Sequence, residues 1–254
     1  MNYTSYYKKI GQGKNIVLLH GFLESSEVWQ QIIEKLQDKY CIIAPDLLGH
    51  GKTVSIADIH SMEMMAEAVN QILETEKINE CILVGHSMGG YVALAFAEKF
   101  PQKTKGILLM NSTPLPDSDE KKANRDRVVT AVDNEKTFFV RNAVTNLFSE
   151  ENKVLMKDKV EQVIKIAMQI PNQGIKAASL GMKNRPDRTA VLKSLHIAKH
   201  FIIGREDALI PYNKLIEIAN QVNASYSILN GGHMSYIENE SETIQILNDF
   251  ANEI

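Results

Sequence analysis

Short apolar runs rich in β-branched residues alternate with amphipathic segments along the first half of the chain. The runs are typical of buried strands, and apolar positions that recur every three or four residues are typical of helices. Strands that alternate with helices predict a parallel sheet covered by helices on both faces. We expect the strands at residues 16–20, 41–44, 81–84 and 106–110, and the helices at residues 27–39, 61–77 and 90–100.

The alternation stops after Asn111 and returns at His200. Residues 117–193 contain no convincing strand, and they predict helices at 118–132, 135–148, 150–170 and 173–183. Beyond them we expect strands at 200–204 and 225–229 and helices at 212–222 and 241–252.

This division predicts an α/β core made of residues 1–114 and 194–254. An all-helical cap, residues 115–193, is inserted into the core and covers the carboxyl edge of the sheet. The sheet should be twisted and mostly parallel, with about seven strands. Thr4–Lys9 can supply one antiparallel hairpin strand.

Composition narrows the class of protein. The chain has 254 residues, 44% of them apolar and 23% charged, so it can bury a large core. Its net charge of −3 gives no sign of a basic surface that would bind nucleic acid or an anionic membrane. It has no apolar run long enough for a membrane span and no signal-peptide pattern, so we expect a cytoplasmic protein. Cys41 and Cys81 are expected to be buried, reduced thiols. No motif supports a metal or another cofactor, and the sequence makes no prediction of oligomeric state.

The segment Gly85-His86-Ser87-Met88-Gly89 lies between the third strand, residues 81–84, and the helix that follows it. A strand that turns directly into a helix at G-x-S-x-G forms a nucleophile elbow, which exposes the serine hydroxyl on a tight turn. The glycines give room where strand and helix approach each other. Ser87 is therefore the candidate nucleophile, and the alternative is a serine that caps an ordinary helix.

A serine nucleophile needs a base, and the base needs a carboxylate that fixes its tautomer. Asp207 and His233 follow the strands at 200–204 and 225–229, so both belong to loops at the carboxyl edge of the sheet. The order serine, aspartate, histidine is the one expected for such an elbow. Glu206 is an alternative acid, but its position in the loop favours Asp207.

Two backbone amides are candidates for an oxyanion hole, those of Met88, directly after the nucleophile, and Phe22, in the loop after the first long strand. Candidate substrate contacts are His86, Tyr91, Phe138 and Phe139, although packing is the more common role of His86 and the two phenylalanines in such positions. Arg125, Arg127, Arg141 and Arg185 could bind a substrate carboxylate, although solvated helix charges are the more common role of such arginines.

With these segments the chain resembles the α/β-hydrolase superfamily, in the group of small esterases and enol-lactonases. The resemblance rests on Leu18–Phe22, Pro45–Gly51, Gly85–Gly90, Gly204–Asp207 and Gly231–His233. It implies that Ser87, His233 and Asp207 act as a catalytic triad without a cofactor. The serine disfavours the chemistry of relatives that use an aspartate nucleophile. His86 and Tyr91 replace the tyrosine and arginine usual in the menaquinone-pathway synthase of this fold.

Together these features predict a hydrolase that cleaves a small-to-medium carboxylic ester or lactone through an acyl-enzyme. The expected partner is thus a small ester-like molecule, and neither nucleic acid nor membrane. Two alternatives stay open. The same triad could serve a C–C bond hydrolase or lyase, and the scaffold could serve as a ligand receptor.

Overall fold

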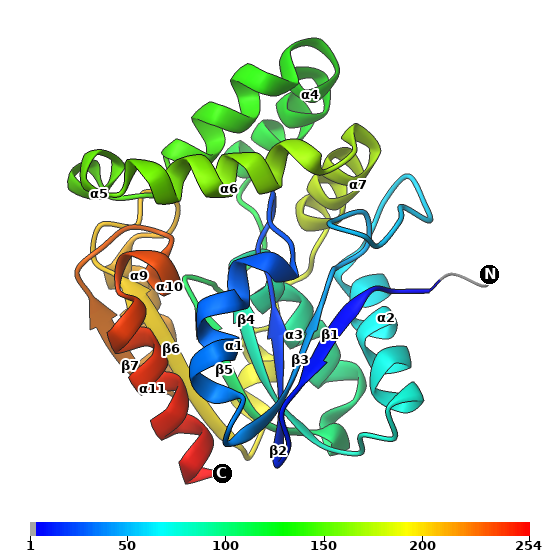
Figure 1. The fold of residues 1–254 in the computed structure, drawn as a ribbon, viewed down its shortest axis with the longest axis vertical. Coiled ribbons are helices and arrows are strands. Elements are labelled where there is room, and N and C mark those ends of the chain that lie inside the picture. Colours follow the sequence, from blue (N-terminus) through cyan, green and yellow to red (C-terminus); the bar gives the residue numbers. More distant parts are fainter. Residues whose placement is uncertain (1–3) are drawn as a thin grey trace.

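The computed structural model describes residues 4–254 as a twisted sheet flanked by helices, with a helical insert across one end (Figure 1). The seven strands have the order β1-β3-β2-β4-β5-β6-β7, and all neighbours are parallel except β1 and β3. The strands are β1 (Tyr7–Ile10), β2 (Lys14–Leu19), β3 (Tyr40–Pro45), β4 (Cys81–His86), β5 (Thr104–Met110), β6 (Ala198–Gly204) and β7 (Ser225–Leu229).

The predicted mostly parallel sheet is confirmed, but the prediction of an N-terminal hairpin is wrong. β1 is antiparallel, yet it pairs with β3, with Lys8 opposite Ala44. The reason is that β2 lies between β3 and β4 and forms hydrogen bonds with both. Its two edges are therefore occupied, and β1 adds to the free edge of β3 instead.

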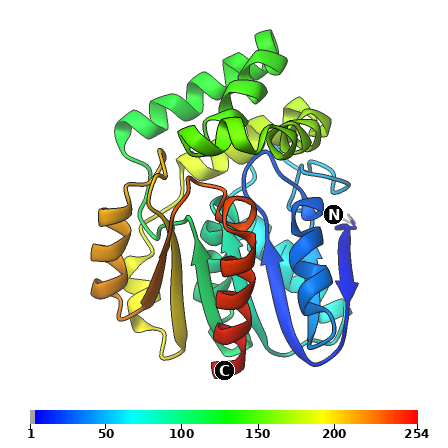
Figure 2. The same ribbon diagram turned by 60° about the vertical axis from the view of Figure 1, so that its left-hand side comes forward.

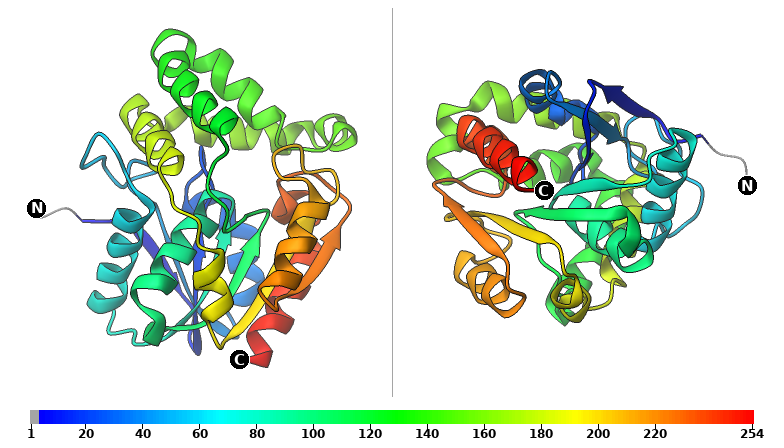
Figure 3. Two further views of the ribbon diagram at one scale, coloured as in Figure 1. Left: turned by 180° about the vertical axis from the view of Figure 1, so that it is seen from behind. Right: turned by 90° about the horizontal axis from the view of Figure 1, so that it is seen from below.

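Helices cover both faces of the sheet (Figures 1 and 3). α1 (Gln30–Leu36) and α11 (Glu240–Glu253) lie on one face, and α2 (Met62–Thr75), α3 (Met88–Lys99) and α9 (Tyr212–Gln221) lie on the other. Three short helices complete the core: the 3-10 helices η1 (Ser26–Trp29) and η2 (Pro101–Lys103), and α10 (Ser235–Glu238).

Neighbouring residues of the central strands contribute to opposite faces, as the strand geometry requires. In β2, Val17 and Leu19 pack with α2 and α3, whereas Ile16 and Leu18 pack on the side of α1. Both faces are buried, so these strands appear in the sequence as continuous apolar runs rather than as alternating patterns. Among residues 4–254 no helix is both long and apolar enough to cross a membrane.

The helical insert lies between β5 and β6 and covers the carboxyl edge of the sheet (Figures 1 and 2). Its longest helix, α4, departs from helical geometry at Glu135, between the two helices predicted from the sequence. The predicted helix 150–170 is likewise divided at Met156. The helices of the insert are α4 (Asp119–Thr145), α5 (Glu150–Leu155), α6 (Lys157–Gln169), α7 (Asn172–Lys183) and α8 (Thr189–Ser194).

The two connections of the insert with the core run side by side. The backbone N–H of Arg188, where the chain returns, donates to the carbonyl of Pro114, where it leaves, at 2.9 Å. The buried Arg188 guanidinium also bonds Glu63 of α2 and Glu98 of α3. This arginine therefore ties the base of the insert to the core.

A second attachment is formed by α7, which packs directly on the core loop of residues 49–60. Gly174 and Gly181 are seven residues apart, so they lie on the same face of α7. A Cβ atom at either position would overlap a main-chain oxygen of the loop, that of Gly49 or of His60. The backbone N–H of His60 donates to Ala177 of α7 at 3.0 Å. Close backbone approach thus fixes this side of the insert on the core.

Gly181→Ala should therefore lower the free energy of unfolding by about 1–3 kcal/mol, because the added methyl group has rigid backbone as its neighbour. Urea denaturation measures the change. Gln162→Ala, at an exposed position of α6, is the control and should change it by less than about 0.5 kcal/mol. Equal stability of Gly181→Ala and the parent protein would contradict the close packing.

Candidate active site

The elbow at Ser87 combines a positive φ angle with very close packing. Ser87 is the residue between the end of β4 and the start of α3, and it has φ 49° and ψ −115°. Its N–H donates to Met110 of β5 at 3.0 Å. A Cβ atom at Gly85 would overlap the backbone of α3, and one at Gly89 would overlap Leu19 of β2. The two glycines therefore permit a turn that holds the serine in a strained conformation.

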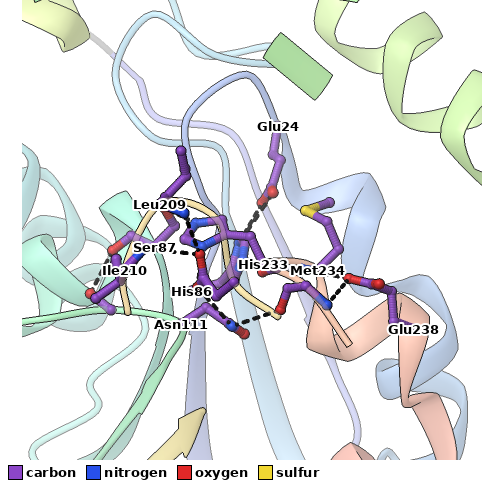
Figure 4. Close-up of polar contacts among 12 residues, drawn as sticks. Glu24, His86, Ser87, Asn111, Leu209, Ile210, His233, Met234 and Glu238 are labelled. Carbon is purple, nitrogen blue, oxygen red and sulfur yellow. Dashed lines mark hydrogen bonds and ion pairs between the residues drawn. The ribbon is translucent and has the colours of Figure 1, made fainter. Parts of the chain in front are cut away.

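The structure brings Ser87, His233 and Asp207 together at the carboxyl edge of the sheet. His233 Nε2 lies 2.8 Å from Ser87 Oγ, and its Nδ1 lies 2.7 Å from Asp207 Oδ2 (Figure 4). The carboxylate is an acceptor, so Nδ1 carries the hydrogen and Nε2 can accept the serine proton. Ser87 lies on β4–α3, Asp207 follows β6 and His233 follows β7, as the sequence predicts.

Asp207 is held as an ionised, buried carboxylate. Its Oδ1 accepts from the backbone N–H groups of Leu209 and Ile210 at 2.8 and 3.0 Å, and Oδ2 accepts from Asn111 Nδ2 at 3.1 Å. Burial raises the pKa of Asp207, but the adjacent His233 and these donors outweigh it, so the pKa lies below its ordinary value. An ionised aspartate keeps the histidine in one tautomer.

The loop that carries His233 is fixed by Glu238 of α10. Glu238 Oε1 accepts from the backbone N–H groups of Gly232 and Met234 at 3.0 and 3.1 Å, and Oε2 accepts from Ser149 N and Asn152 Nδ2 in the insert. One carboxylate therefore joins the loop of the base to the helical insert.

A buried ion pair, Glu24–His86, lies behind the elbow. His86 Nδ1 is 3.1 Å from Glu24, and His86 Nε2 donates to the main-chain oxygen of His233 at 2.8 Å. Glu24 also accepts from the N–H of Gly21 at 2.6 Å. The pair thus connects the loop after β2 with the loop of His233 (Figure 4).

The pKa values of this pair move in opposite directions. Burial raises the pKa of Glu24, but the charge and hydrogen bond of His86 outweigh it and leave the pKa below its ordinary value. Burial lowers the pKa of His86, but Glu24 and the carbonyl of His233 outweigh it and leave the pKa raised. His86 is therefore a structural imidazolium, with both ring nitrogens used by the protein.

The two candidate oxyanion donors lie on loops beside Ser87. Met88 is the first residue of α3, so its N–H has no acceptor one turn earlier within the helix. Phe22 follows Gly21, whose N–H is held by Glu24, and precedes Leu23, which has φ 65°. The Glu24 contact fixes the backbone directly before the Phe22 amide.

A cavity of about 480 Å³ lies between these loops and the insert, and Ser87 and His233 open into it. Phe22, His86, Tyr91 and Phe139 also line it. The remaining lining residues come from both sides of the cavity: Leu23, Glu24, Ser118, Glu120, Lys121, Asn124, Arg125, Val128, Ala143, Asn146, Leu147, Met182, Ala208, Leu209 and Ile210.

The prediction that Phe138 lines this cavity is wrong. Its side chain is 66% exposed and lines a separate surface pocket on α4. Consecutive helical residues point about 100° apart, and here Phe139 faces the cavity whereas Phe138 faces solvent. Tyr91 is buried beneath the Arg185 guanidinium, which lies 3.9 Å from the centre of its ring.

The four arginines considered from the sequence have partners within the protein. Arg125 and Arg185 share the buried carboxylate of Asp117 at 3.0 and 2.8 Å, and only Arg125 lines the cavity. Arg141 pairs with Glu161, and Arg127 bonds Asn124, on the exposed side of the insert. Within residues 4–254, no group of three or more His, Cys, Asp or Glu residues is arranged to hold a metal ion.

Sequence reasoning missed Glu24, Asn111, Glu238 and Lys121. Glu24 left a usable signal, an acid four residues after His20 in an otherwise apolar and small-residue loop. Asn111 directly follows β5, the place where a loop side chain can reach the site. No sequence pattern distinguishes Glu238 and Lys121 from solvated helix charges.

Glu24→Gln should destabilise the protein by about 3–5 kcal/mol near pH 6, because it leaves a buried imidazolium without its anion. The pair contributes fully above the unfolded-state pKa of glutamate, about 4.3, and below that of histidine, about 6.5. Its contribution is lost as the pH rises through the raised pKa of His86 or falls through the lowered pKa of Glu24.

Urea denaturation of both proteins at about pH 6 and about pH 9 tests this expectation, and the difference should be smaller at the higher pH. Glu27→Gln, at an exposed position of η1, is the matched control. If the loss of unfolding free energy caused by Glu24→Gln does not vary with pH, His86 is not charged in the folded protein.

Comparison with known proteins agrees with this architecture. A solved thermophilic esterase from Thermogutta terrifontis is 29% identical with a TM-score of 0.94, and the match covers 98% of this chain and 93% of that one. A pimeloyl-[acyl-carrier protein] methyl ester esterase from Aeromonas hydrophila is 26% identical over 255 residues, which covers 96% of this chain and 97% of the relative.

An uncharacterized protein of Mycobacterium tuberculosis is 34% identical over 110 residues, and this match covers 43% of the chain but only 32% of the relative. The family model described as alpha/beta hydrolase fold matches residues 14–240. This range includes the strands β2–β7 as well as Ser87, Asp207 and His233. The chain therefore belongs to the alpha/beta hydrolase fold family.

Proposed function

We propose that the protein is a serine hydrolase that cleaves a small-to-medium carboxylic ester or lactone through an acyl-enzyme. The observation that carries this proposal is the continuous row of hydrogen bonds from Ser87 Oγ through His233 to Asp207. A serine hydroxyl becomes a competent nucleophile when a neighbouring base removes its proton, and the imidazole has the required position and tautomer.

In the first half of the reaction, Ser87 Oγ attacks the carbonyl carbon while His233 Nε2 takes the hydroxyl proton. The imidazolium that forms donates from Nδ1 to Asp207, whose lowered pKa keeps it ionised. The bond to the alcohol then breaks, and the leaving oxygen takes the proton from Nε2. In the second half, water attacks the acyl-enzyme with the same base, which releases the acid and restores the serine.

The backbone N–H groups of Phe22 and Met88 are the proposed donors to the oxyanion of each tetrahedral intermediate. Such a donor typically stabilises the transition state by about 2.7–4 kcal/mol. The buried Glu24–His86 pair supports this role because it holds Gly21, the residue before Phe22, and the backbone of His233 in one arrangement.

Two features support a small-to-medium substrate. A cavity of about 480 Å³ accommodates a small organic molecule, and its lining includes apolar side chains from the insert, such as Val128, Phe139 and Met182. The likeness to the Thermogutta and Aeromonas esterases supports ester chemistry. His86 is proposed to shape the inner wall of the cavity, and Tyr91 and Phe139 to contact the substrate.

Ser87→Ala should reduce the turnover of a 4-nitrophenyl ester of butyrate by at least about a thousandfold, because the acyl-enzyme can no longer form. Release of nitrophenolate measures turnover. Ser241→Ala, at an exposed position of α11, should leave the rate unchanged. A fluorophosphonate should add covalently to the parent protein and to Ser241→Ala but not to Ser87→Ala, as mass spectrometry can show. Full turnover by Ser87→Ala would refute the proposed nucleophile.

A further inference from the structure

Lys121 of α4 is a cation at the cavity with no acidic partner. It lines the same cavity as Ser87 and His233. Its Nζ donates to the main-chain oxygen of Leu209 at 3.2 Å, and among residues 4–254 no carboxylate lies within ion-pair distance of it. An ammonium group has three donors, so two are free for a ligand.

The surroundings of Lys121 make an unpaired ammonium costly. It lies in the first turn of α4, where the helix dipole disfavours a positive charge. Its side chain is only partly exposed, and burial lowers its pKa in spite of Asp117 and Asp207 nearby. An anion bound in the cavity would compensate both unfavourable effects.

The three acids near Lys121 have other partners or are solvated. Asp117 is bound by both Arg125 and Arg185, so it is not free to pair with Lys121. Asp207 accepts from His233 and Asn111. Glu120 lines the cavity but has an exposed side chain. None of these carboxylates is therefore a direct partner of the Lys121 ammonium.

We propose that Lys121 binds a carboxylate of the substrate, so that the preferred substrate is an ester of small size that carries a second, ionised carboxyl group. This inference rests on the proposed hydrolase function and names its substrate class. The carboxylate lies at the end of the cavity where α4 begins, and the ester carbonyl lies at Ser87.

Paired esters test the inference. The acyl arm compares 4-nitrophenyl hydrogen glutarate with 4-nitrophenyl hexanoate, and the alcohol arm compares the butyrate esters of 4-hydroxybenzoate and phenol. For each pair, the ratio of kcat/KM for the charged ester to that for the uncharged ester isolates the effect of the carboxylate. In one arm the ratio should exceed one for the parent protein.

Lys121→Met should lower that ratio by at least about tenfold, mainly through KM, since a hydrogen bond to a charged group is lost. Lys121→Arg, which keeps the charge, should retain part of the preference. Lys122→Met is the matched control: Lys122 is the next residue of the helix and pairs with Asp119, so its loss should leave the ratio unchanged. An unchanged ratio in Lys121→Met would overturn the inference.

A binding measurement separates this inference from the proposed function. The glutarate monoanilide carries an amide in place of the ester, and calorimetry can measure its binding without turnover. Weaker binding to Lys121→Met than to Lys122→Met supports the carboxylate site even if no ester is cleaved. Equal binding to the two variants argues against the site even if the ester hydrolysis depends on Ser87.

Discussion

The position of the His233 imidazole is the constraint on which the site depends. Its Nδ1 is held by Asp207, its main-chain oxygen by His86, and its N–H by the carbonyl of Leu147 at 2.6 Å. Glu238 binds the amides on both sides of it. These partners come from four separate parts of the chain, so the base occupies its place only when the sheet, α10 and the insert are all assembled. The contacts that set the geometry of the candidate site are therefore also contacts of the tertiary structure.

The insert is consequently part of the framework that holds His233, as well as a cover for the cavity. Leu147 and Ser149, in the connection between α4 and α5, bond His233 and Glu238. On the opposite side α7 packs on the core loop through Gly181. A substitution at either attachment should therefore alter the position of the base or the shape of the cavity, even where the side chain is far from the substrate.

The sequence predicted the features that depend on local order along the chain. Ser87, Asp207 and His233 each directly follow a strand, and the carboxyl ends of parallel strands share one edge, so their proximity could be inferred before any coordinates. The pairing of β1 could not, because it depends on which sheet edge remains free. The prediction that Phe138 lines the cavity was wrong because the orientation of α4 about its own axis is set by packing with other helices. Such contacts leave no trace in local patterns.

Several buried charges of the site have a partner of opposite charge. Glu24 and His86 neutralise each other, Asp117 has its arginines, and Asp207 awaits the imidazolium that forms during the proposed reaction. In each case a buried charge faces its opposite, because an unpaired charge is expensive where water is scarce. Lys121 has only a carbonyl as its partner. An anionic group of the proposed substrate would supply the opposite charge that this ammonium lacks within the cavity.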